Sequence, residues 1–318
     1  MPRSNLKLMS TFHVETPTID AEIFQRRHLY FKLENLQKSG SFKDRGIGNM
    51  ILRLCERGEV KKLISSSGGN AGHSVATVGE SLGLPVDVYV PVTTNAMMIG
   101  KIKKKGANVF VGGENWNAAD EIARTAVKTE DSAYYIPPYD NELIWDGHSS
   151  IVDEIETVGL KPDRIVLSVG GGGLLCGVQR GLERLGWTST TIIAVETEGA
   201  ASFAAAQSAG HPVRLSKIDT VASSLGALSV TAAALQSKVR TESLVVTDAE
   251  AVAACIRFAN EYRSLVEPAC GASLAAVYED IHWRRIAPRG DEVVVVIVCG
   301  GSVVSLDLLQ TWRDKYIV

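Results

Sequence analysis

The chain has 318 residues, of which 45% are hydrophobic and 22% charged, and its formal net charge is −3. These values are typical of folded globular proteins, and they exclude both a largely disordered chain and a strongly basic one of the kind that binds nucleic acid. The longest apolar run, 293–299, is far shorter than the ~20 residues that a membrane helix needs. We therefore expect about two domains and a small-molecule ligand, with no nucleic-acid and no membrane partner.

Short β-branched runs alternate with longer helical patterns along the chain. In the first half the predicted strands are 63–64, 86–90, 108–111 and 133–136, and the predicted helices are 71–82, 96–105 and 115–128. In the second half the predicted strands are 165–169, 192–195, 244–246 and 293–298, with helices that begin at Leu174, Asp248 and Pro268. Strands separated by helices indicate parallel sheets covered on both faces, so the predicted fold class is α/β.

The cysteines, the histidines and the first 14 residues bear on the cellular location of the protein and on metal binding. The five cysteines form no CxxC pair, and neither they nor the six histidines have the spacing of a zinc site. Residues 1–14 contain no apolar stretch of the kind found in a secretory signal. We therefore expect a cytoplasmic protein from a reducing compartment, without a transition metal.

Four consecutive glycines, Gly170 to Gly173, stand between the predicted strand 165–169 and the helix that begins at Leu174. Glycine lets backbone N–H groups approach a ligand closely, and the N-terminus of a helix favours an anion. The run therefore predicts a phosphate site, although a tight turn without a ligand could have the same sequence. The patterns GxGxxG and GxxxxGK[ST] are both absent, so we expect a ligand smaller than a dinucleotide.

A second candidate is Lys43, which lies between the small residues that follow Ser39 and an apparent helix start. The helix dipole and partial burial both lower the pKa of a lysine in such a position. An amine with a lowered pKa can form an imine with a carbonyl compound. Taken alone, the feature is weak, because most lysines are solvated.

Two further segments join a strand to a helix through polar residues and glycines. Residues 65–72 offer hydroxyl, amide and backbone donors at a helix start, which suit a carboxylate or simply cap the helix. Residues 298–302 end the predicted strand 293–298, and ligands of parallel sheets bind beyond the carboxyl ends of the strands. Cys299 in this segment is either a site residue or a buried core thiol.

In this order, the segments resemble the fold-type-II pyridoxal-phosphate enzymes, and more narrowly the L-serine/L-threonine dehydratases of the serine dehydratase-like family. The motifs that carry the resemblance are SGSFKDRGIG (39–48), SSGGNAG (66–72), PPYDNELIWDGHSSIVDEI (137–155), SVGGGGLLCG (168–177), AVETEGA (194–200), SLGA (224–227), VEPACGASLAA (266–276) and VVVIVCGG (294–301). The resemblance implies two domains, each an open, mostly parallel sheet with helices on both faces, as in the tryptophan synthase β subunit. Residues 1–40 and 138–318 would form the large cofactor-binding domain and residues 41–137 the small one.

The resemblance also implies roles for single residues. Lys43 would attach covalently to the cofactor, pyridoxal 5'-phosphate, and act as the catalytic base, while Phe42 would pack on the cofactor ring. Asn70 would bind a ring oxygen, and Cys299 would face the ring nitrogen. The cofactor phosphate would be bound by Gly170, Gly171, Gly172, Gly173 and Leu174.

Further implied features are a substrate site, a cation site and an assembly. The substrate carboxylate would be held by Ser67, Gly68 and Asn70. A monovalent cation, expected to be potassium, would lie near Glu196, Ala200 and Ser202. The assembly implied is a homodimer.

The activity that the resemblance implies is the dehydration and deamination of L-serine and L-threonine, which gives pyruvate or 2-oxobutanoate and ammonia. The alternatives are another reaction of the same fold type (threonine synthase, β-replacement or serine racemase) and a small-molecule binding protein without catalysis. Asp44, Gly68 and Ser302 depart from the usual dehydratase motifs. These departures leave the substrate preference and the rate open.

Overall fold

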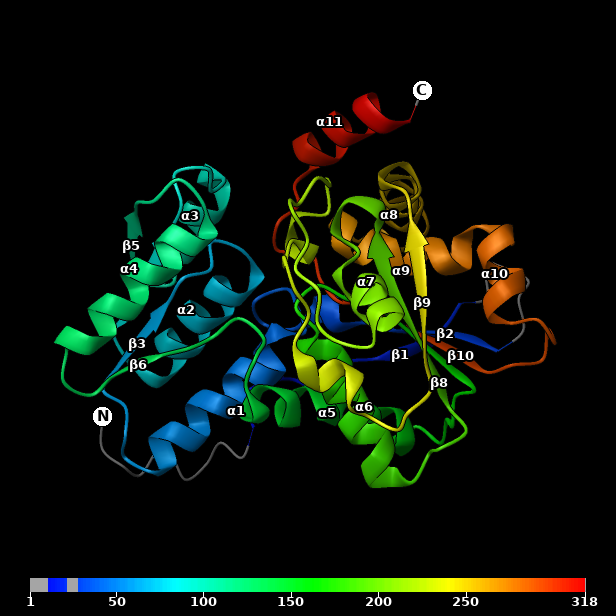
Figure 1. The fold of residues 1–318 in the computed structure, drawn as a ribbon, viewed down its shortest axis with the longest axis horizontal. Coiled ribbons are helices and arrows are strands. Elements are labelled where there is room, and N and C mark those ends of the chain that lie inside the picture. Colours follow the sequence, from blue (N-terminus) through cyan, green and yellow to red (C-terminus); the bar gives the residue numbers. More distant parts are fainter. Residues whose placement is uncertain (1–10, 22–27, 318) are drawn as a thin grey trace. The chain divides into compact units, whose positions relative to one another are not determined.

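The computed structural model describes residues 11–21 and 28–317. The chain divides into two compact units. Unit 1 comprises Met1–Val14 and Gln37–Gly147, and unit 2 comprises Glu15–Leu36 and His148–Val318. The helix α5 (Glu142–Thr157) contains the point at which the chain passes from unit 1 to unit 2 (Figure 1). The assignment of 1–40 and 138–318 to a cofactor-binding domain stays a prediction.

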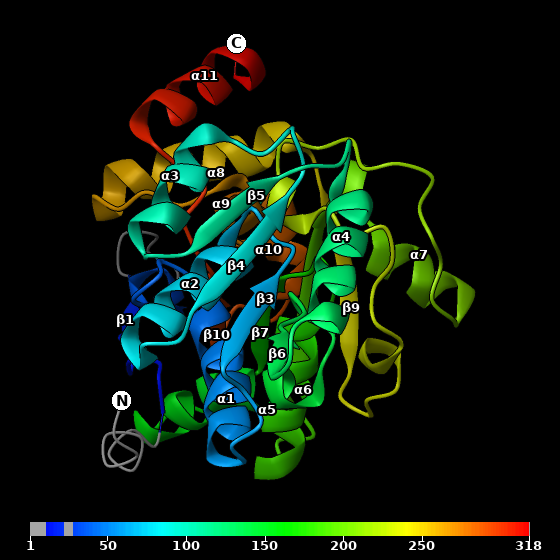
Figure 2. The ribbon, with the colours of Figure 1, turned by 90° about the vertical axis from the view of Figure 1, so that its left-hand side faces the viewer.

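Unit 1 is built around a parallel sheet whose strands, in the described residues, stand in the order β5-β4-β3-β6. The strands are β3 (Lys62–Ser65), β4 (Val86–Val90), β5 (Asn108–Val111) and β6 (Ala133–Tyr135). Figure 2 shows them side by side in this order. The structure confirms the strands predicted for this half of the chain, because each is a short apolar run bounded by polar or turn-forming residues.

One helix precedes the strands of unit 1, and three others connect them, so that helices cover both faces of the sheet. They are α1 (Lys43–Glu56), α2 (Asn70–Leu82), α3 (Ala96–Lys104) and α4 (Trp116–Thr129). After α2 and after α3 the chain moves outward by one strand, and after α4 it returns across the sheet to β6. Crossovers between parallel strands are right-handed, so this reversal puts α4 on the face opposite α2 and α3 (Figure 1).

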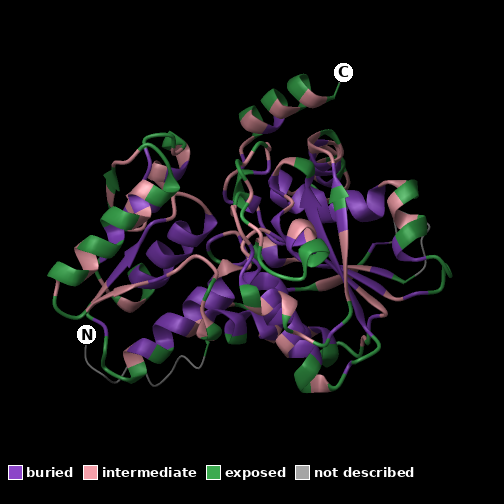
Figure 3. Ribbon diagram, viewed as in Figure 1, coloured by how far each residue is buried: buried purple, intermediate pink, exposed green. Residues whose placement is uncertain are grey.

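Unit 2 contains a larger sheet, with the strand order β1-β2-β10-β7-β8-β9 in the described residues. The strands are β1 (Thr18–Asp20), β2 (Leu29–Lys32), β7 (Arg164–Ser168), β8 (Thr191–Thr197), β9 (Thr241–Val246) and β10 (Val294–Ile297). Only β1 runs antiparallel to its neighbour among these described strands. Every residue of β8 and β10 is buried, and the centre of this sheet is purple in Figure 3. Burial on both faces explains why these strands are continuous apolar runs.

The helices of unit 2 cover both faces of this sheet in the same way. They are α6 (Gly173–Leu185), α7 (Ser202–Ala209), α8 (Asp248–Tyr262), α9 (Pro268–Tyr278), α10 (Asp280–Ile286) and α11 (Leu306–Tyr316). The direction of the strand order reverses after β9, so α8 and α9 lie on the face opposite α6 and α7. Helix α9 is buried along its whole length, and a β-carbon on Gly271 would lie 2.1 Å from the Ala251 carbonyl oxygen of α8. This close approach requires the small residues of α9.

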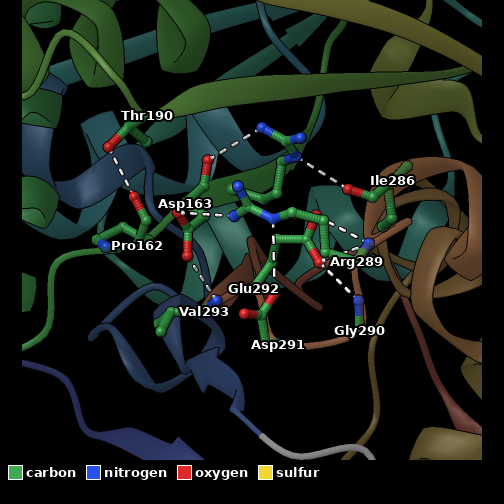
Figure 4. Close-up of polar contacts among 10 residues, drawn as sticks. Pro162, Asp163, Thr190, Ile286, Arg289, Gly290, Asp291, Glu292 and Val293 are labelled. Carbon is green, nitrogen blue, oxygen red and sulfur yellow. Dashed lines mark hydrogen bonds and ion pairs between the residues drawn. The ribbon is translucent and has the colours of Figure 1, made fainter.

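A polar network joins the N-terminal ends of β7 and β10 (Figure 4). The Asp163 carboxylate accepts a hydrogen bond of 2.9 Å from the Val293 N–H and pairs with Arg289 at 3.4 Å. The buried Glu292 carboxylate accepts hydrogen bonds from the N–H groups of Arg289 and Gly290. The network fixes where the two strands begin, at the end of β7 opposite the glycine run.

The described residues also give the state of the cysteines and the presence or absence of metal-ligand groups and membrane-spanning helices. All five cysteines are free, and four of them are buried. The described residues contain no group of three or more His, Cys, Asp or Glu side chains placed to hold a metal ion. Within residues 11–21 and 28–317, no helix is both long enough and apolar enough to cross a membrane.

Candidate active site

Lys43 is the first residue of α1 in unit 1. Gly40 in the turn before it has a φ of +83°, a conformation that glycine adopts without strain. The Lys43 Nζ donates a hydrogen bond of 2.5 Å to the Pro138 carbonyl oxygen and lies 5.0 Å from the centre of the Phe42 ring. Pro138 follows β6, so the amine lies beyond the carboxyl end of that strand. Ligands of parallel sheets bind at this end.

Asp44 is buried and ties the turn before Lys43 to helix α2. Its carboxylate accepts hydrogen bonds from the Ser39 N–H at 2.7 Å and from the Ser74 hydroxyl at 2.6 Å. Burial raises the pKa of Asp44, although the hydrogen bonds oppose the shift. Sequence reasoning identified Asp44 only as a departure from a motif; the structure gives it a role in holding the segment that carries Lys43.

The loop of residues 66–69 connects β3 to α2 and contains Ser67. The Gly69 N–H donates to the Ser67 Oγ at 3.3 Å, and the His73 N–H donates to the Gly69 carbonyl oxygen at 3.1 Å. A β-carbon on Gly72 would lie only 1.7 Å from the Ser67 carbonyl oxygen. The loop therefore lies directly on the first turn of α2, and the N–H groups at a helix N-terminus favour an anion such as a carboxylate.

The other predicted substrate residues lie on the same segment. Asn70 is the first residue of α2 and is buried, and a β-carbon on Gly68 would lie 2.5 Å from the Thr94 Cγ2. His73 lies on the next turn of α2, with its Nδ1 3.0 Å from the Ser39 carbonyl oxygen. Together with Asp44, this contact connects the segment that carries Lys43 to the helix that carries Asn70. His73 is not among the residues predicted from the sequence, although it directly follows the motif 66–72.

The glycine run in unit 2 forms the turn between β7 and α6, as the sequence predicts. Gly172 precedes the first helical residue and has a φ of +92°, and a β-carbon on it would lie 2.8 Å from Val230. Both the conformation and the space therefore require glycine. The Gly171 carbonyl oxygen accepts from the Thr231 N–H at 3.1 Å, whereas the N–H groups of 170–173 donate to no acceptor among the described residues.

Ser168 is the last residue of β7 and stands directly before this turn. It is only 6% exposed, and its Oγ has no hydrogen-bond partner in the described part of the chain. A buried hydroxyl without a protein partner is uncommon in a folded protein, and beside an anion-binding turn it can donate to a ligand. The hydroxyl, the free N–H groups and the helix N-terminus are all groups that bind a phosphate. The residues present therefore fit the phosphate of pyridoxal 5'-phosphate. Ser168 belongs to the motif 168–177 but is not among the predicted site residues.

Cys299 follows β10, the neighbour of β7 in the sheet. The register pairs Val296 with Val166, so Cys299 and the glycine run lie at the same edge of the unit 2 sheet. The thiol is 5% exposed. A hydrogen bond with Cys270, together with burial, raises the pKa of Cys299 well above its usual value. The thiol therefore keeps its proton at neutral pH.

The three residues expected near a cation follow one another from β8 to α7. The buried Glu196 carboxylate accepts hydrogen bonds from the N–H groups of Phe203 at 2.7 Å and Ala204 at 2.8 Å, at the N-terminus of α7. Burial raises the pKa of Glu196 to about 7, and these hydrogen bonds oppose the shift. Ala200 ends the short 3-10 helix between them. The buried Ser202 Oγ has no hydrogen-bond partner among the residues that the structure describes.

Known proteins match the chain along most of its length. The family model described as "Pyridoxal-phosphate dependent enzyme" matches residues 9–300. The human L-serine dehydratase/L-threonine deaminase is 44% identical over 314 residues, which are 95% of this chain and 95% of the human one. A solved fungal L-serine ammonia-lyase from Rhizomucor miehei is 36% identical with a TM-score of 0.90, covering 96% of this chain and 100% of its own. The processed form of threonine deaminase isoform 2 from Solanum lycopersicum is 27% identical with a TM-score of 0.86, covering 96% of this chain and 89% of its own.

These matches confirm two predictions from the sequence. The fold class, with two mostly parallel sheets and helices on both faces of each, is the one predicted. The family named from the motifs is the family whose model matches 9–300. The chain therefore belongs to the pyridoxal-phosphate dependent enzymes.

Proposed function

We propose that this protein is a lyase that converts L-serine to pyruvate and ammonia, and L-threonine to 2-oxobutanoate and ammonia. The observation that carries the proposal is the 44% identity, along 95% of both chains, to a human protein named for these two activities. Two groups in the structure support it: an amine at the start of α1 in unit 1, and before α6 in unit 2 a turn whose N–H groups suit a phosphate.

Lys43 has two tasks in this proposal. It would hold the cofactor covalently, and its amine, when free beside the substrate Cα, would take the proton from that carbon. A base held beside the reacting carbon acts as if at a very high concentration, which lowers the barrier by several kcal/mol. The cofactor, when bound, supplies an electron-poor ring that spreads the negative charge developing at Cα.

The loop after β3 orients the substrate. The Ser67 hydroxyl, the Asn70 amide and the N–H groups of the first turn of α2 are donors for the substrate carboxylate. With the carboxylate held, the Cα–H bond and the β-hydroxyl have a fixed orientation. Orientation of this kind is a large part of enzymatic rate enhancement.

Cys299 influences which reaction follows proton removal. Because its pKa is raised, the thiol carries no negative charge and would not keep a ring nitrogen protonated, as a carboxylate would. The thiol would therefore add nothing to the withdrawal of charge from Cα. We expect prompt loss of the β-hydroxyl to compete better against racemisation and transamination. The Cys299→Asp variant should therefore form more of the products of racemisation and transamination.

Product analysis tests the proposed function. The purified protein should release keto acid from L-serine and L-threonine but not from O-phosphohomoserine. Lys43→Ala should abolish this release, whereas Lys61→Ala, at an exposed lysine just before β3, should not. Borohydride reduction followed by peptide mass spectrometry should find the cofactor attached to Lys43.

Other outcomes of the same assay would contradict the proposal. No keto acid from either amino acid would exclude the dehydratase activity, and D-serine as the main product would indicate a racemase. Threonine formed from O-phosphohomoserine would indicate a threonine synthase. A colourless protein that pyridoxal phosphate does not change would indicate a binding protein without catalysis.

The monovalent-cation site is part of the proposal. We propose that potassium binds near Glu196, Ala200 and Ser202, and the partnerless Ser202 hydroxyl supports this position. Replacing potassium by tetramethylammonium should lower the midpoint temperature of unfolding and the activity. Ser202→Ala should reduce that response to potassium, whereas Ser208→Ala, on an exposed part of the same helix, should leave it unchanged. Equal stability in both salts would contradict the site.

The assembly and the location are also proposed. We propose a cytoplasmic homodimer, on the resemblance to serine dehydratases and on the absence of any disulfide among the five cysteines. Sedimentation equilibrium should give twice the chain mass of 34.1 kDa. A mass equal to one chain would contradict the dimer, and a fluorescent fusion excluded from the cytoplasm would contradict the location.

A further inference from the structure

A cluster of four polar residues in unit 1 includes Ser66 of the Ser67 loop (residues 66–69). Its members are Ser66, Asp120, Arg124 and Tyr135. The Ser66 Oγ donates to the Asp120 Oδ1 at 2.7 Å and lies 2.9 Å from the Tyr135 hydroxyl oxygen. The Tyr135 hydroxyl donates to the same carboxylate oxygen, and the Arg124 Nε donates to the other at 2.7 Å. The Arg124 guanidinium lies 4.2 Å from the centre of the Tyr135 ring. The cluster thus joins the carboxyl ends of β3 and β6 to helix α4.

The charge state of Asp120 makes these hydrogen bonds strong. Burial alone would raise the pKa of Asp120, but the hydrogen bonds from Ser66, Tyr135 and Arg124 outweigh burial and lower it. Burial and the bond to Asp120 raise the pKa of Tyr135, so its hydroxyl keeps the proton that it donates. Hydrogen bonds to an ionised acceptor are about twice as strong as those between neutral groups. Ser66 is therefore held by a charged group.

Ser66 is the residue directly before Ser67. Ser66 is fully buried and Ser67 is half-buried. Ser66 and Ser67 are the first two loop residues after β3, and the Ser67 Oγ accepts from the Gly69 N–H at 3.3 Å. A Ser66 side chain bound to Asp120 therefore holds the backbone that carries the Ser67 hydroxyl. On the other side of the loop, the Ser67 carbonyl oxygen is in close contact with Gly72 of α2. The loop is fixed at both of these points.

We propose that Asp120 and Tyr135 are positioning residues for the substrate carboxylate, which they influence by holding Ser66 and thereby orienting the Ser67 hydroxyl. This inference rests on the proposed function, in which Ser67 binds that carboxylate. It has a specific consequence: ligands with a carboxylate depend on the cluster, and ligands that lack one do not.

Two variants and a matched control test the inference. Ser66→Ala removes the anchored hydroxyl, and Tyr135→Phe removes a donor while it keeps the ring beside Arg124. The control is Ser65→Ala, because Ser65, the last residue of β3, is equally buried and its Oγ has no hydrogen-bond partner among the described residues. L-serine and 2-aminoethanol are the probes, since they share the amine and the hydroxyl and differ in the carboxylate.

In the holoenzyme, Ser66→Ala and Tyr135→Phe should raise the KM for L-serine about 10-fold, the usual effect of losing a charge-assisted hydrogen bond, with a much smaller change in kcat. The inhibition constant of 2-aminoethanol should not change. Ser65→Ala should leave all three quantities unchanged. An unchanged KM in both variants would overturn the inference, and so would equal losses of affinity for the two probes.

Hydrogen exchange of the cofactor-free protein gives a second readout that needs no activity. Ser66→Ala and Tyr135→Phe should speed the exchange of peptides that cover 66–72, while Ser65→Ala should not. Unchanged exchange in both variants would overturn the anchoring role. If the wild-type protein makes no keto acid, the proposed function fails, but the exchange comparison still decides whether the cluster holds the loop.

Discussion

The carbonyl oxygen of Ser67 occupies the space beside Gly72 so fully that a β-carbon on Gly72 would lie 1.7 Å from it. No β-carbon approaches an oxygen so closely, so a side chain at Gly72 has to push the Ser67 loop off α2. The loop that is proposed to bind the substrate carboxylate and the helix behind it therefore fit together only because residue 72 has no side chain.

Gly72→Ala should accordingly destabilise unit 1 and displace the loop. Overpacking against backbone cannot be relieved by a change of rotamer, and we expect the free energy of unfolding to fall by about 3 kcal/mol. Urea unfolding measures this loss. The control is Gly100→Ala, inside α3, where a β-carbon would meet nothing within 4 Å. That change should stabilise the protein by about 0.5–1 kcal/mol, since alanine is the better helix former. Equal effects of the two changes on the free energy of unfolding would contradict the close contact between the Ser67 loop and Gly72.

The glycines at the two ends of α6 allow a matched comparison that tests where the cofactor phosphate binds. Gly172 precedes the helix with a φ of +92°, and Gly186 follows it with a φ of +66°. A β-carbon on Gly172 would lie 2.8 Å from Val230, whereas one on Gly186 would meet nothing within 4 Å. Both alanine variants should lose about 1 kcal/mol of stability from the left-handed conformation. Only Gly172→Ala should also weaken pyridoxal-phosphate binding, by about 10-fold or more, because it changes the direction of the N–H groups in the turn.

Titration of the cofactor-free variants with pyridoxal phosphate, followed by absorbance, measures this difference. Gly186→Ala should bind as the wild type does. Equal affinities of the two variants would show that the turn does not bind the phosphate.

The sequence predicts those helices and strands that are specified by residues within or directly beside them. The runs 86–90 and 108–111 have the bounds of β4 and β5, and Asp248 and Pro268 are the first residues of α8 and α9, as predicted. Strands β1 and β2 are not among the predicted elements. In β2 the buried Lys32 pairs at 2.5 Å with Glu154, which is 122 residues away. A local sequence pattern cannot show a partner so far away in the chain. The lysine alone makes the run 29–32 look unlike a buried strand, and β2 is therefore not predicted.

The same distinction applies to the candidate site. The turn at the glycine run is predictable because positive φ is a property of the residues themselves. The role of Asp44 is not predictable, since it depends on Ser39 and on Ser74, which is 30 residues away. Ser168 attracts notice only when its burial and its partnerless hydroxyl are known.

Asp44 should be replaceable by asparagine but not by alanine. An asparagine can accept from the Ser39 N–H through its oxygen and donate to the Ser74 Oγ through its nitrogen, so Asp44→Asn should cost less than about 1 kcal/mol. Asp44→Ala leaves a buried N–H and a buried hydroxyl without their acceptor and should cost about 3 kcal/mol. Urea unfolding at neutral pH compares the two variants, and similar losses would contradict this account. Because burial raises the pKa of Asp44 above 3.8, the wild type should also lose stability relative to Asp44→Asn as the pH rises above that value.

His73 should make the stability of unit 1 depend on pH in the opposite direction. Burial lowers the pKa of His73 below 6.5; the cationic side chains of Lys101 and Lys105 act in the same sense, while the bond to the Ser39 carbonyl oxygen and the charge of Glu80 oppose the shift. The unfolded chain therefore takes up a proton near pH 6.5 before the folded protein does. Stability from the neutral imidazole is complete above that pH and is lost as the pH falls below it, by at most about 1.4 kcal/mol per pH unit.

His73→Asn removes this titration, and its amide nitrogen can still donate to the Ser39 carbonyl oxygen as the imidazole Nδ1–H does. The difference in unfolding free energy between wild type and His73→Asn should be constant from about pH 8 to about pH 7 and should then move in favour of the variant as the pH falls toward about 5. Urea unfolding of both proteins across this range measures the difference, and the titrations of the other histidines cancel because both proteins contain them. A difference that stays constant below pH 6.5 would show that the imidazole titrates in the folded protein as it does in the unfolded chain.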